Sequence, residues 1–159
     1  MKLGVSVIAT VLNEGQSIEV LLNSLAEQTR PPDEVVLVDG GSTDGTLEKL
    51  RAFRQPGIDI VVISQPGANI AQGRNTAIAA ARGPLIAVTD AGVRLERDWL
   101  AQLIAPFEGE HPPDVVCGFF VPDPRSTFEL ALGAATLPLL QEIDPATFYP
   151  SSRSVAFRR

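Results

Sequence analysis

Hydrophobic residues in this chain gather in five short runs, and between these runs they recur every three or four positions. Short runs without alternation are typical of strands covered on both faces, and the wider spacing is typical of the helices that cover them. This order predicts an α/β fold, Rossmann-like, with a mostly parallel sheet flanked by helices. The predicted strands are residues 4–9, 34–38, 59–63, 85–89 and 115–121.

Helical spacing is clearest between the first two strands and after the fourth. In both places apolar side chains form a stripe on one face of the predicted helix. Pairs with the spacing of a capping box, Asn13 with Gln16 and Asn69 with Gln72, predict where helices begin. The two stripes are Ile18, Leu21, Leu22 and Leu25, and Trp99, Leu100, Leu103, Ile104 and Phe107.

Length and charge narrow the class of protein. The 159 residues, 45% of them apolar, suffice for one domain with a core, and we expect a single domain over residues 1–159. There are 19 acidic and 13 basic side chains, so the basic surface typical of nucleic-acid binding is missing and no nucleic-acid partner is expected. Any phosphate must be held by a few local donors.

Three segments indicate whether the protein is secreted, cytoplasmic or inserted in a membrane. Cys117 lies within an apolar run, so we expect a buried, unreactive thiol. The apolar residues 1–12 are too few for a signal peptide, and a cytoplasmic location is expected. Residues 128–140 are largely apolar but shorter than the roughly 20 residues that cross a bilayer, so we predict a helix of the core or of a cleft.

Two predicted strands end on an aspartate. Asp39 follows the run 34–38, and Asp90 follows the run 85–89. Ligands of open α/β sheets bind beyond the carboxyl ends of the strands, so these carboxylates mark a candidate site. The loop after Asp39 carries glycines, Gly41 among them, that let backbone amides approach an anion. An ordinary strand-to-helix turn explains these glycines equally well.

Arg74 gives an independent indication of a site. On the predicted helix 70–82 it belongs to the stripe that faces the sheet, together with Ala71, Asn75, Ile78 and Ala81. Burial of its guanidinium requires an anionic partner. That partner can be a structural carboxylate such as Asp39 or the diphosphate of a bound nucleotide, and the two are compatible.

Asp90 begins a short Asp-Ala-Gly element that is a candidate metal site. Mg²⁺ takes one or two protein carboxylates and completes its shell with phosphates and water, so one aspartate can suffice. We expect Glu96 and Asp98 to be solvated residues near a helix start. His111 lies in a Pro-flanked loop without a second His or Cys nearby, and we expect it at the surface.

Together these stretches resemble the family 2 glycosyltransferases, nucleotide-sugar enzymes of the GT-A fold. The similar segments follow the family's order and spacing over nearly the whole chain. They are Val5 to Glu14, Glu34 to Thr46 with its VDGGSTDGT, Gly73 to Ile78, and Thr89 to Gly92 followed by Trp99 and Leu100.

The resemblance implies a UDP- or GDP-linked sugar as donor and a glycan, lipid or glycoconjugate as acceptor. Asp39 would accept a hydrogen bond from the base, Arg74 would face the base or the diphosphate, and Asp90 would hold Mg²⁺ or Mn²⁺. Thr10, Leu12 and Glu14 would line the nucleoside pocket. The residues in the family's nucleotide-sugar-binding positions are Ala9, Thr10, Leu12, Glu14, Asp39, Gly41, Arg74 and Asp90.

Three features depart from the family pattern. Ala9 and Leu12 stand where the family has proline and a base-stacking tyrosine, which bears on the identity of the base. Gly40 replaces a second aspartate in the loop after the second strand. Gly92 replaces the last aspartate of the D-x-D element, and Asp90 is left as its one carboxylate.

Family members continue beyond residues 156–159 into an acceptor-side region with the acidic general base. We therefore expect residues 1–159 to be the C-terminally truncated donor half of an inverting enzyme. Alone, they are expected to show negligible transferase turnover. The resemblance also implies a role in cell-envelope polysaccharide synthesis and, for the complete protein, peripheral contact with the inner face of the membrane.

An alternative from another class is a non-catalytic nucleotide-sugar-binding or assembly module that keeps the fold after losing its metal site. Asp-Ala-Gly at 90–92 is its main support. Other nucleotide enzymes are disfavoured. No glycine-rich basic loop follows the first strand, as a sugar nucleotidyltransferase would need, and neither G-x-G-x-x-G nor G-x-x-x-x-G-K-[ST] follows any strand.

Overall fold

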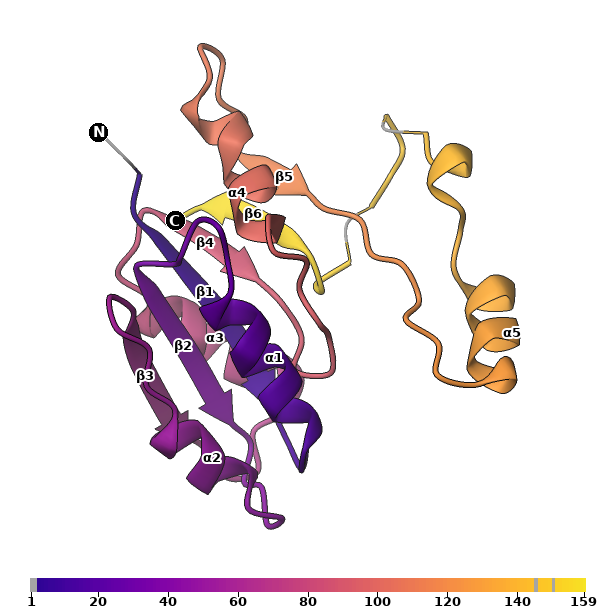
Figure 1. Ribbon diagram of the computed structural model, residues 1–159. Helices are drawn as coiled ribbons and strands as arrows, with labels where there is room; N and C mark the ends of the chain where they lie inside the picture. Colours follow the sequence, from indigo (N-terminus) through magenta and orange to yellow (C-terminus); the bar gives the residue numbers. More distant parts are fainter. Residues whose placement is uncertain (1–2, 145, 150) are drawn as a thin grey trace.

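The computed structural model describes residues 3–144, 146–149 and 151–159. Within them, six strands form one mixed sheet with helices on both faces, which confirms the predicted α/β architecture (Figure 1). The strands are β1 (Val5–Val11), β2 (Glu34–Asp39), β3 (Asp59–Ser64), β4 (Leu85–Val88), β5 (Val115–Cys117) and β6 (Val155–Arg158). The helices are α1 (Ser17–Ala26), α2 (Thr46–Ala52), α3 (Ile70–Ala80), α4 (Trp99–Ile104) and α5 (Thr127–Thr136), with 3₁₀ turns at Ala105–Glu108 and Leu140–Glu142.

The sheet order is β3-β2-β1-β4-β6-β5, and its first four strands are parallel. The register places Val11 of β1 opposite Asp39 of β2, and Ile8 opposite Val88 of β4. The loops that follow these three strands therefore leave the same edge of the sheet. This carboxyl edge is where ligands bind in open α/β sheets.

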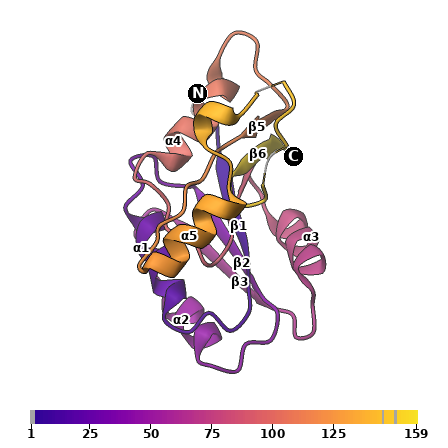
Figure 2. The same ribbon diagram turned by 90° about the vertical axis from the view of Figure 1, so that its right-hand side faces the viewer.

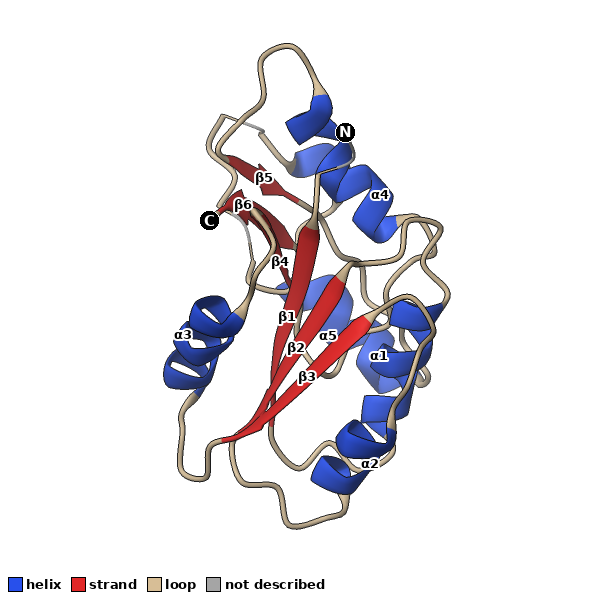
Figure 3. Ribbon diagram, turned by 90° about the vertical axis from the view of Figure 1, so that its left-hand side faces the viewer, coloured by secondary structure: helices blue, strands red, loops and turns tan. Residues whose placement is uncertain are grey.

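Two hydrophobic cores lie on opposite faces of the sheet, because successive side chains of a strand point to opposite sides. Figures 2 and 3 show α3 on one face and α1 and α2 on the other. Each central strand is thus buried on both faces, which explains its continuous apolar run. The larger core includes Val7, Leu21, Leu25, Leu37, Leu50, Leu100 and Ile104, and the smaller one Ile8, Val36, Ala77, Ile86 and Val88.

The fifth apolar run is not the long buried strand that its pattern predicts. β5 covers only three residues, lies at the edge of the sheet and is partly exposed. It pairs antiparallel with β6, which in turn pairs antiparallel with β4. The prediction of a buried thiol at Cys117 is wrong, since this residue of the edge strand is exposed.

The segment that contains α5 extends away from the sheet (Figure 1). The prediction of a core or cleft helix over residues 128–140 is wrong, because most of its large apolar side chains are exposed; Phe128, for example, is 75% exposed. Gly133 is the buried residue of α5, and it packs against Pro122. Among the described residues, no helix is both long and apolar enough to span a membrane.

The two predicted capping boxes have different outcomes. At Asn69 the box is present: the Asn69 side chain accepts from the Gln72 amide, and the Gln72 side chain accepts from the Asn69 amide. At Asn13 the prediction is wrong, because α1 begins at Ser17 with no side-chain cap. Asn13 has a positive φ of 53° and instead contacts the loop after β2.

A buried carboxylate joins the start of β2 to the end of α3. Glu34 accepts hydrogen bonds from Ser6 Oγ at 2.5 Å, from the Arg82 amide at 2.9 Å and from Arg82 Nε at 2.7 Å. Arg82 also pairs with Asp59. Burial raises the pKa of Glu34, but the hydrogen bonds from Ser6 and Arg82 outweigh it and hold the pKa below its ordinary value of 4.5.

We expect Glu34→Gln to lower the free energy of unfolding by about 2 kcal/mol at neutral pH, because it removes the charge from these hydrogen bonds. A carboxylate with a lowered folded-state pKa contributes stability above its unfolded-state pKa and loses it as the pH falls through the folded-state value. The difference between wild type and variant should therefore shrink below pH 4.5. Urea unfolding from pH 7 to pH 3 measures it. Glu27→Gln, at an exposed glutamate, is the control, and an equal loss at every pH would contradict the assignment.

Candidate functional site

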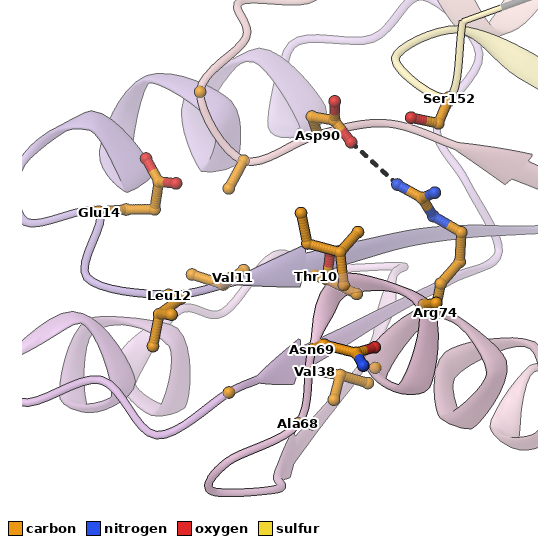
Figure 4. A pocket seen from close by; sticks show the side chains of 16 residues that line it. Thr10, Val11, Leu12, Glu14, Val38, Ala68, Asn69, Arg74, Asp90 and Ser152 are labelled. Atoms are coloured by element: carbon orange, nitrogen blue, oxygen red, sulfur yellow. Dashed lines mark hydrogen bonds and ion pairs between the residues drawn. The ribbon is translucent and has the colours of Figure 1, made fainter.

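A cavity of about 680 Å³ opens at the carboxyl edge of the parallel strands, and we call it the donor cavity. Its walls come from the loops after β1, β2 and β4 and from the beginning of α3. Figure 4 shows Arg74 and Asp90 pointing toward one another, with Leu12 and Glu14 at the opposite end. The lining residues are Thr10, Val11, Leu12, Glu14, Val38, Gly40, Ala68, Asn69, Ile70, Ala71, Gly73, Arg74, Asp90, Ala91, Gly92 and Ser152.

Gly73 allows α3 to lie close against the strands below the cavity. A Cβ at this position would lie 2.9 Å from Cγ2 of Thr10 on β1, so any larger residue would push the helix away. The capping box at Asn69 fixes where the helix begins, and its first residues line the cavity. The amino end of α3 therefore faces this space, and the helix dipole favours an anion there.

The structure brings together only part of the predicted nucleotide-sugar-binding set. Ala9 is buried in the larger core rather than in the cavity wall. Asp39 and Gly41 also lie outside the wall, although Gly40 between them is part of it. The predicted residues that do line the donor cavity are Thr10, Leu12, Glu14, Arg74 and Asp90.

Asp39 is fully buried at the end of β2. Its Oδ2 atom accepts hydrogen bonds from the amides of Gly41 and Ser42, both at 3.0 Å. Its Oδ1 atom is buried and has no hydrogen-bond partner among the described residues. A buried carboxylate oxygen without a donor is costly. Asp39 does not line the donor cavity, so the expected hydrogen bond from a base to this atom stays a prediction.

The glycine loop after β2 is held by the loop after β1. The Thr43 amide donates to Asn13 Oδ1 at 2.9 Å, and the Thr46 amide donates to Asp44 Oδ1 at 3.1 Å. The Thr46 hydroxyl also donates to Asp44, and this bond lowers the pKa of the Asp44 carboxyl. Like the amides that donate to Asp39, these amides already have hydrogen-bond partners within the protein. The amides at the amino end of α3 are therefore better placed to bind the anion that was expected at this loop.

Arg74 pairs with Asp90 and not with Asp39. Its Nη2 atom lies 3.2 Å from Asp90 Oδ1. Asp39 faces away from Arg74, since α3 packs on the sheet face of Val36 and Val38, and Asp39 alternates with them along β2. The predicted helix stripe is correct only in part: Ala81 is buried and Ile78 packs against the smaller core, but Ala71 and Asn75 are exposed. The buried positions within α3 are Gly73 and Ala77. Arg74 lies at the edge of that buried stripe, with its side chain 25% exposed.

A second cavity, of about 750 Å³, adjoins the first and shares Asp90 and Gly92 with it. Trp99, Phe119 and Phe120 contribute to its walls, so it has an aromatic surface that the donor cavity lacks. Arg153 also lines it, and its Nε atom lies 3.6 Å from Asp90 Oδ2. Asp90 thus lies where the two cavities meet, between two guanidinium groups.

Comparison with known proteins identifies this architecture. Residues 6–153 match the family described as glycosyl transferase family 2. The chain belongs to that family. The glycosyltransferase AglE of Haloferax volcanii is 34% identical over 109 residues, which are 66% of this chain and 36% of the relative. The cholesterol galactosyltransferase of Borreliella burgdorferi is 26% identical over 157 residues, 99% of this chain and 41% of that protein.

Solved structures of glycosyltransferases share the fold. A mannosyltransferase from Pyrobaculum calidifontis in complex with GDP-Man and Mn²⁺ superposes with a TM-score of 0.76 and 26% identity, over 100% of this chain and 45% of the other. TarS of S. aureus in complex with UDP-GlcNAc has a TM-score of 0.63 and 31% identity, over 75% of this chain and 37% of the other. The family 2 chain thus spans less than half the length of these proteins.

The residues of this family 2 chain fit a divalent cation poorly. The described residues contain no group of three or more His, Cys, Asp or Glu side chains that could hold a metal. Glu96 is exposed and pairs with Arg94, and Asp98 accepts from Gln102. Asp90 is the remaining candidate ligand, but guanidinium groups already flank both of its oxygens. The expectation that it holds Mg²⁺ or Mn²⁺ stays a prediction.

Several residues of the family 2 site were not evident from the sequence pattern. Arg153 and Ser152 belong to a serine-rich turn, and no spacing relates them to Asp90. Ile70 and Ala71 line the cavity because the helix begins there, which the capping box did signal. The pairing of distant strands, rather than any local motif, brings the turn 151–154 to the site.

Proposed function

We propose that this family 2 chain binds the nucleoside diphosphate of a UDP- or GDP-linked sugar in the donor cavity, as the donor-binding part of an inverting glycosyltransferase. The observation that carries the proposal is the Arg74 guanidinium in a cavity wall, next to the amino end of α3. Both features favour a phosphate group. The complexes of similar proteins with GDP-Man and UDP-GlcNAc support it.

In the proposed complex the base lies near Gly40 in the cavity wall. A hydrogen bond from the base to Asp39 stays a prediction, because Asp39 is fully buried outside that wall. Thr10, Leu12 and Glu14 surround the nucleoside. The diphosphate lies between Arg74 and the start of α3, and the sugar points toward Asp90. A cavity of about 680 Å³ lies within the size range of small-molecule ligand sites.

The acceptor reaches the sugar through the second cavity, which meets the donor cavity at Asp90 and Gly92. Its hydroxyl oxygen attacks the anomeric carbon as the bond from that carbon to the diphosphate oxygen breaks, and the configuration inverts. The acceptor proton passes to a carboxylate base to which no residue is assigned. Arg74 stabilises the negative charge that develops on the leaving diphosphate.

Aromatic side chains in the second cavity suit an acceptor with apolar surface, whether a sugar ring face or a lipid. The acceptor itself, a role in cell-envelope polysaccharide synthesis, a cytoplasmic location and contact with the inner face of the membrane stay predictions. So does the expectation that residues 1–159 alone transfer negligible sugar. Gly92 in the D-x-D position is the observation that supports the alternative of a non-catalytic module. Sugar turnover by the complete protein would exclude that alternative.

Thermal and urea unfolding with UDP, GDP and ADP tests the proposal. A ligand that binds only the folded state raises its stability by about 2.7 kcal/mol at a hundredfold excess over Kd. We expect this increase with UDP or GDP, and ADP serves as the comparison nucleotide. Equal stability with and without every nucleotide would exclude the proposed donor site.

A further inference from the structure

This inference rests on the proposed nucleotide site. We infer that Arg153 and Arg74 together supply the positive charge that a divalent cation would otherwise bring to the diphosphate. Binding of the nucleotide to this chain is then independent of added metal. The inference rests on the surroundings of Asp90 and Gly92, where the sequence departs from the family pattern.

The carboxylate of Asp90 is shared between two cations. Arg74 Nη2 lies 3.2 Å from its Oδ1 atom, and Arg153 Nε lies 3.6 Å from its Oδ2 atom. Two guanidinium groups around one carboxylate leave a net positive charge at the junction of the two cavities. A divalent cation on Asp90 would have to displace both arginines or lie beside them, and like charges repel.

Position 92 cannot compensate for this repulsion. A glycine offers no oxygen from a side chain, and the carboxylate nearest to it belongs to Glu14, whose Oε2 atom lies 4.0 Å from where a Cβ would be. That same oxygen accepts the Ser17 hydroxyl at 2.6 Å. The D-x-D element thus retains one carboxylate, and arginines occupy both of its oxygens.

The fold holds Arg153 in place for this task. β6 pairs with β4 so that Val155 lies opposite Val88, which brings the turn before β6 beside the loop that carries Asp90. The Trp99 indole donates to Ser154 Oγ at 2.9 Å and anchors the same turn. The Arg153 guanidinium lies 4.9 Å from the ring centroid of Phe120, at the distance of a cation–π contact.

A diphosphate suits this pair of arginines better than Asp90 does. The guanidinium group is planar and offers parallel N–H donors, which match two phosphate oxygens. Both side chains are partly exposed, at 25% for Arg74 and 47% for Arg153, so a ligand can reach them. In the bound state both arginines keep Asp90 between them and donate their remaining N–H groups to the phosphates.

Titration calorimetry of the chain with UDP and GDP, in EDTA and in excess Mn²⁺, tests the inference. We expect the Kd of the better nucleotide to agree within about threefold between the two buffers. Arg153→Ala should weaken binding in EDTA by about 10- to 100-fold, the loss expected for hydrogen bonds to a charged group. Arg97→Ala, at an exposed arginine that lines neither cavity, should leave it unchanged.

Loss of wild-type binding in EDTA with recovery in Mn²⁺ would overturn the inference while the proposed function stands. Wild-type affinity in Arg153→Ala would overturn it as well. Absence of binding by either nucleotide in both buffers would instead reject the proposed function, and the inference with it. Unfolding curves of each variant separate lost binding from lost folding.

A double variant tests the exchange of arginine for metal directly. Gly92→Asp with Arg153→Ala restores the second carboxylate and removes one of the two cations. A Cβ at position 92 meets only the Glu14 carboxylate, so the aspartate fits. We expect Mn²⁺ to tighten nucleotide binding by this variant about tenfold and to leave the wild type unchanged. The same metal response in both proteins would contradict the inference.

Discussion

Arg74→Ala is expected to remove half or more of the stabilisation that UDP or GDP gives to this chain. The guanidinium lies in the wall of the donor cavity and is the cation nearest to the start of α3 there. Charge-assisted hydrogen bonds contribute about 1.5 to 3 kcal/mol each, so the affinity should fall about 10- to 100-fold. Urea unfolding at a fixed nucleotide concentration, compared with the unliganded variant, measures the effect.

The same substitution should hardly change the stability of the unliganded chain. The Arg74–Asp90 pair is partly exposed, and such pairs contribute about 1 kcal/mol or less. Arg51→Ala, at an exposed arginine of α2, is the matched control and should keep the full nucleotide effect. If Arg74→Ala is still stabilised as strongly as wild type, the diphosphate does not lie beside Arg74 and the proposed orientation of the donor is wrong.

Gly83→Ala should destabilise the fold by about 3 kcal/mol, through overpacking and the loss of a hydrogen bond. A Cβ at Gly83 would lie 2.7 Å from the Ser6 amide nitrogen and 3.1 Å from the Leu85 carbonyl oxygen. Both atoms belong to backbone at the start of central strands, so neither can move without breaking the sheet. The Gly83 amide also donates to Ser6 Oγ at 2.9 Å. Denaturant unfolding of the purified variant measures the loss.

Gly109→Ala is the control for this prediction. Its Cβ would have an ordinary contact, 3.5 Å from the Pro106 carbonyl oxygen, and its φ of −76° is open to any residue. We expect its stability to stay within about 0.5 kcal/mol of wild type. Equal stability of Gly83→Ala and Gly109→Ala would show that the connection between α3 and β4 can relax, and would contradict the tight packing against Ser6.

The first four strands could be predicted because their pattern is local. A strand buried on both faces needs a continuous run of apolar residues, and 34–38 and 85–89 have such a run. Of the aspartates that follow these runs, only Asp90 lies in the donor cavity. Asp39 is buried one residue behind its wall, a difference that the chain direction at Gly40 decides.

The run 115–121 shows where local pattern fails. Its apolar residues are those of a buried strand, but only three of them form β5, and Cys117 is exposed. The neighbour that β5 needs is β6, which lies far away in the sequence and inserts between β4 and β5. The hydrophobic pattern of a segment indicates how much of the segment is expected to be buried. It does not indicate which distant strand will pair with the segment and bury it.

The sequence by itself determined the order of the first four strands with the helices between them, the edge of the sheet at which the donor cavity opens, and the family resemblance. Each of these depends on residue type and spacing within short segments. Only the tertiary structure decided that Arg74 pairs with Asp90 and that Arg153 reaches the same carboxylate. Those contacts depend on the antiparallel pairing of β6 with β4 and on the rotation of α3 about its axis, which packing sets and no local spacing reveals.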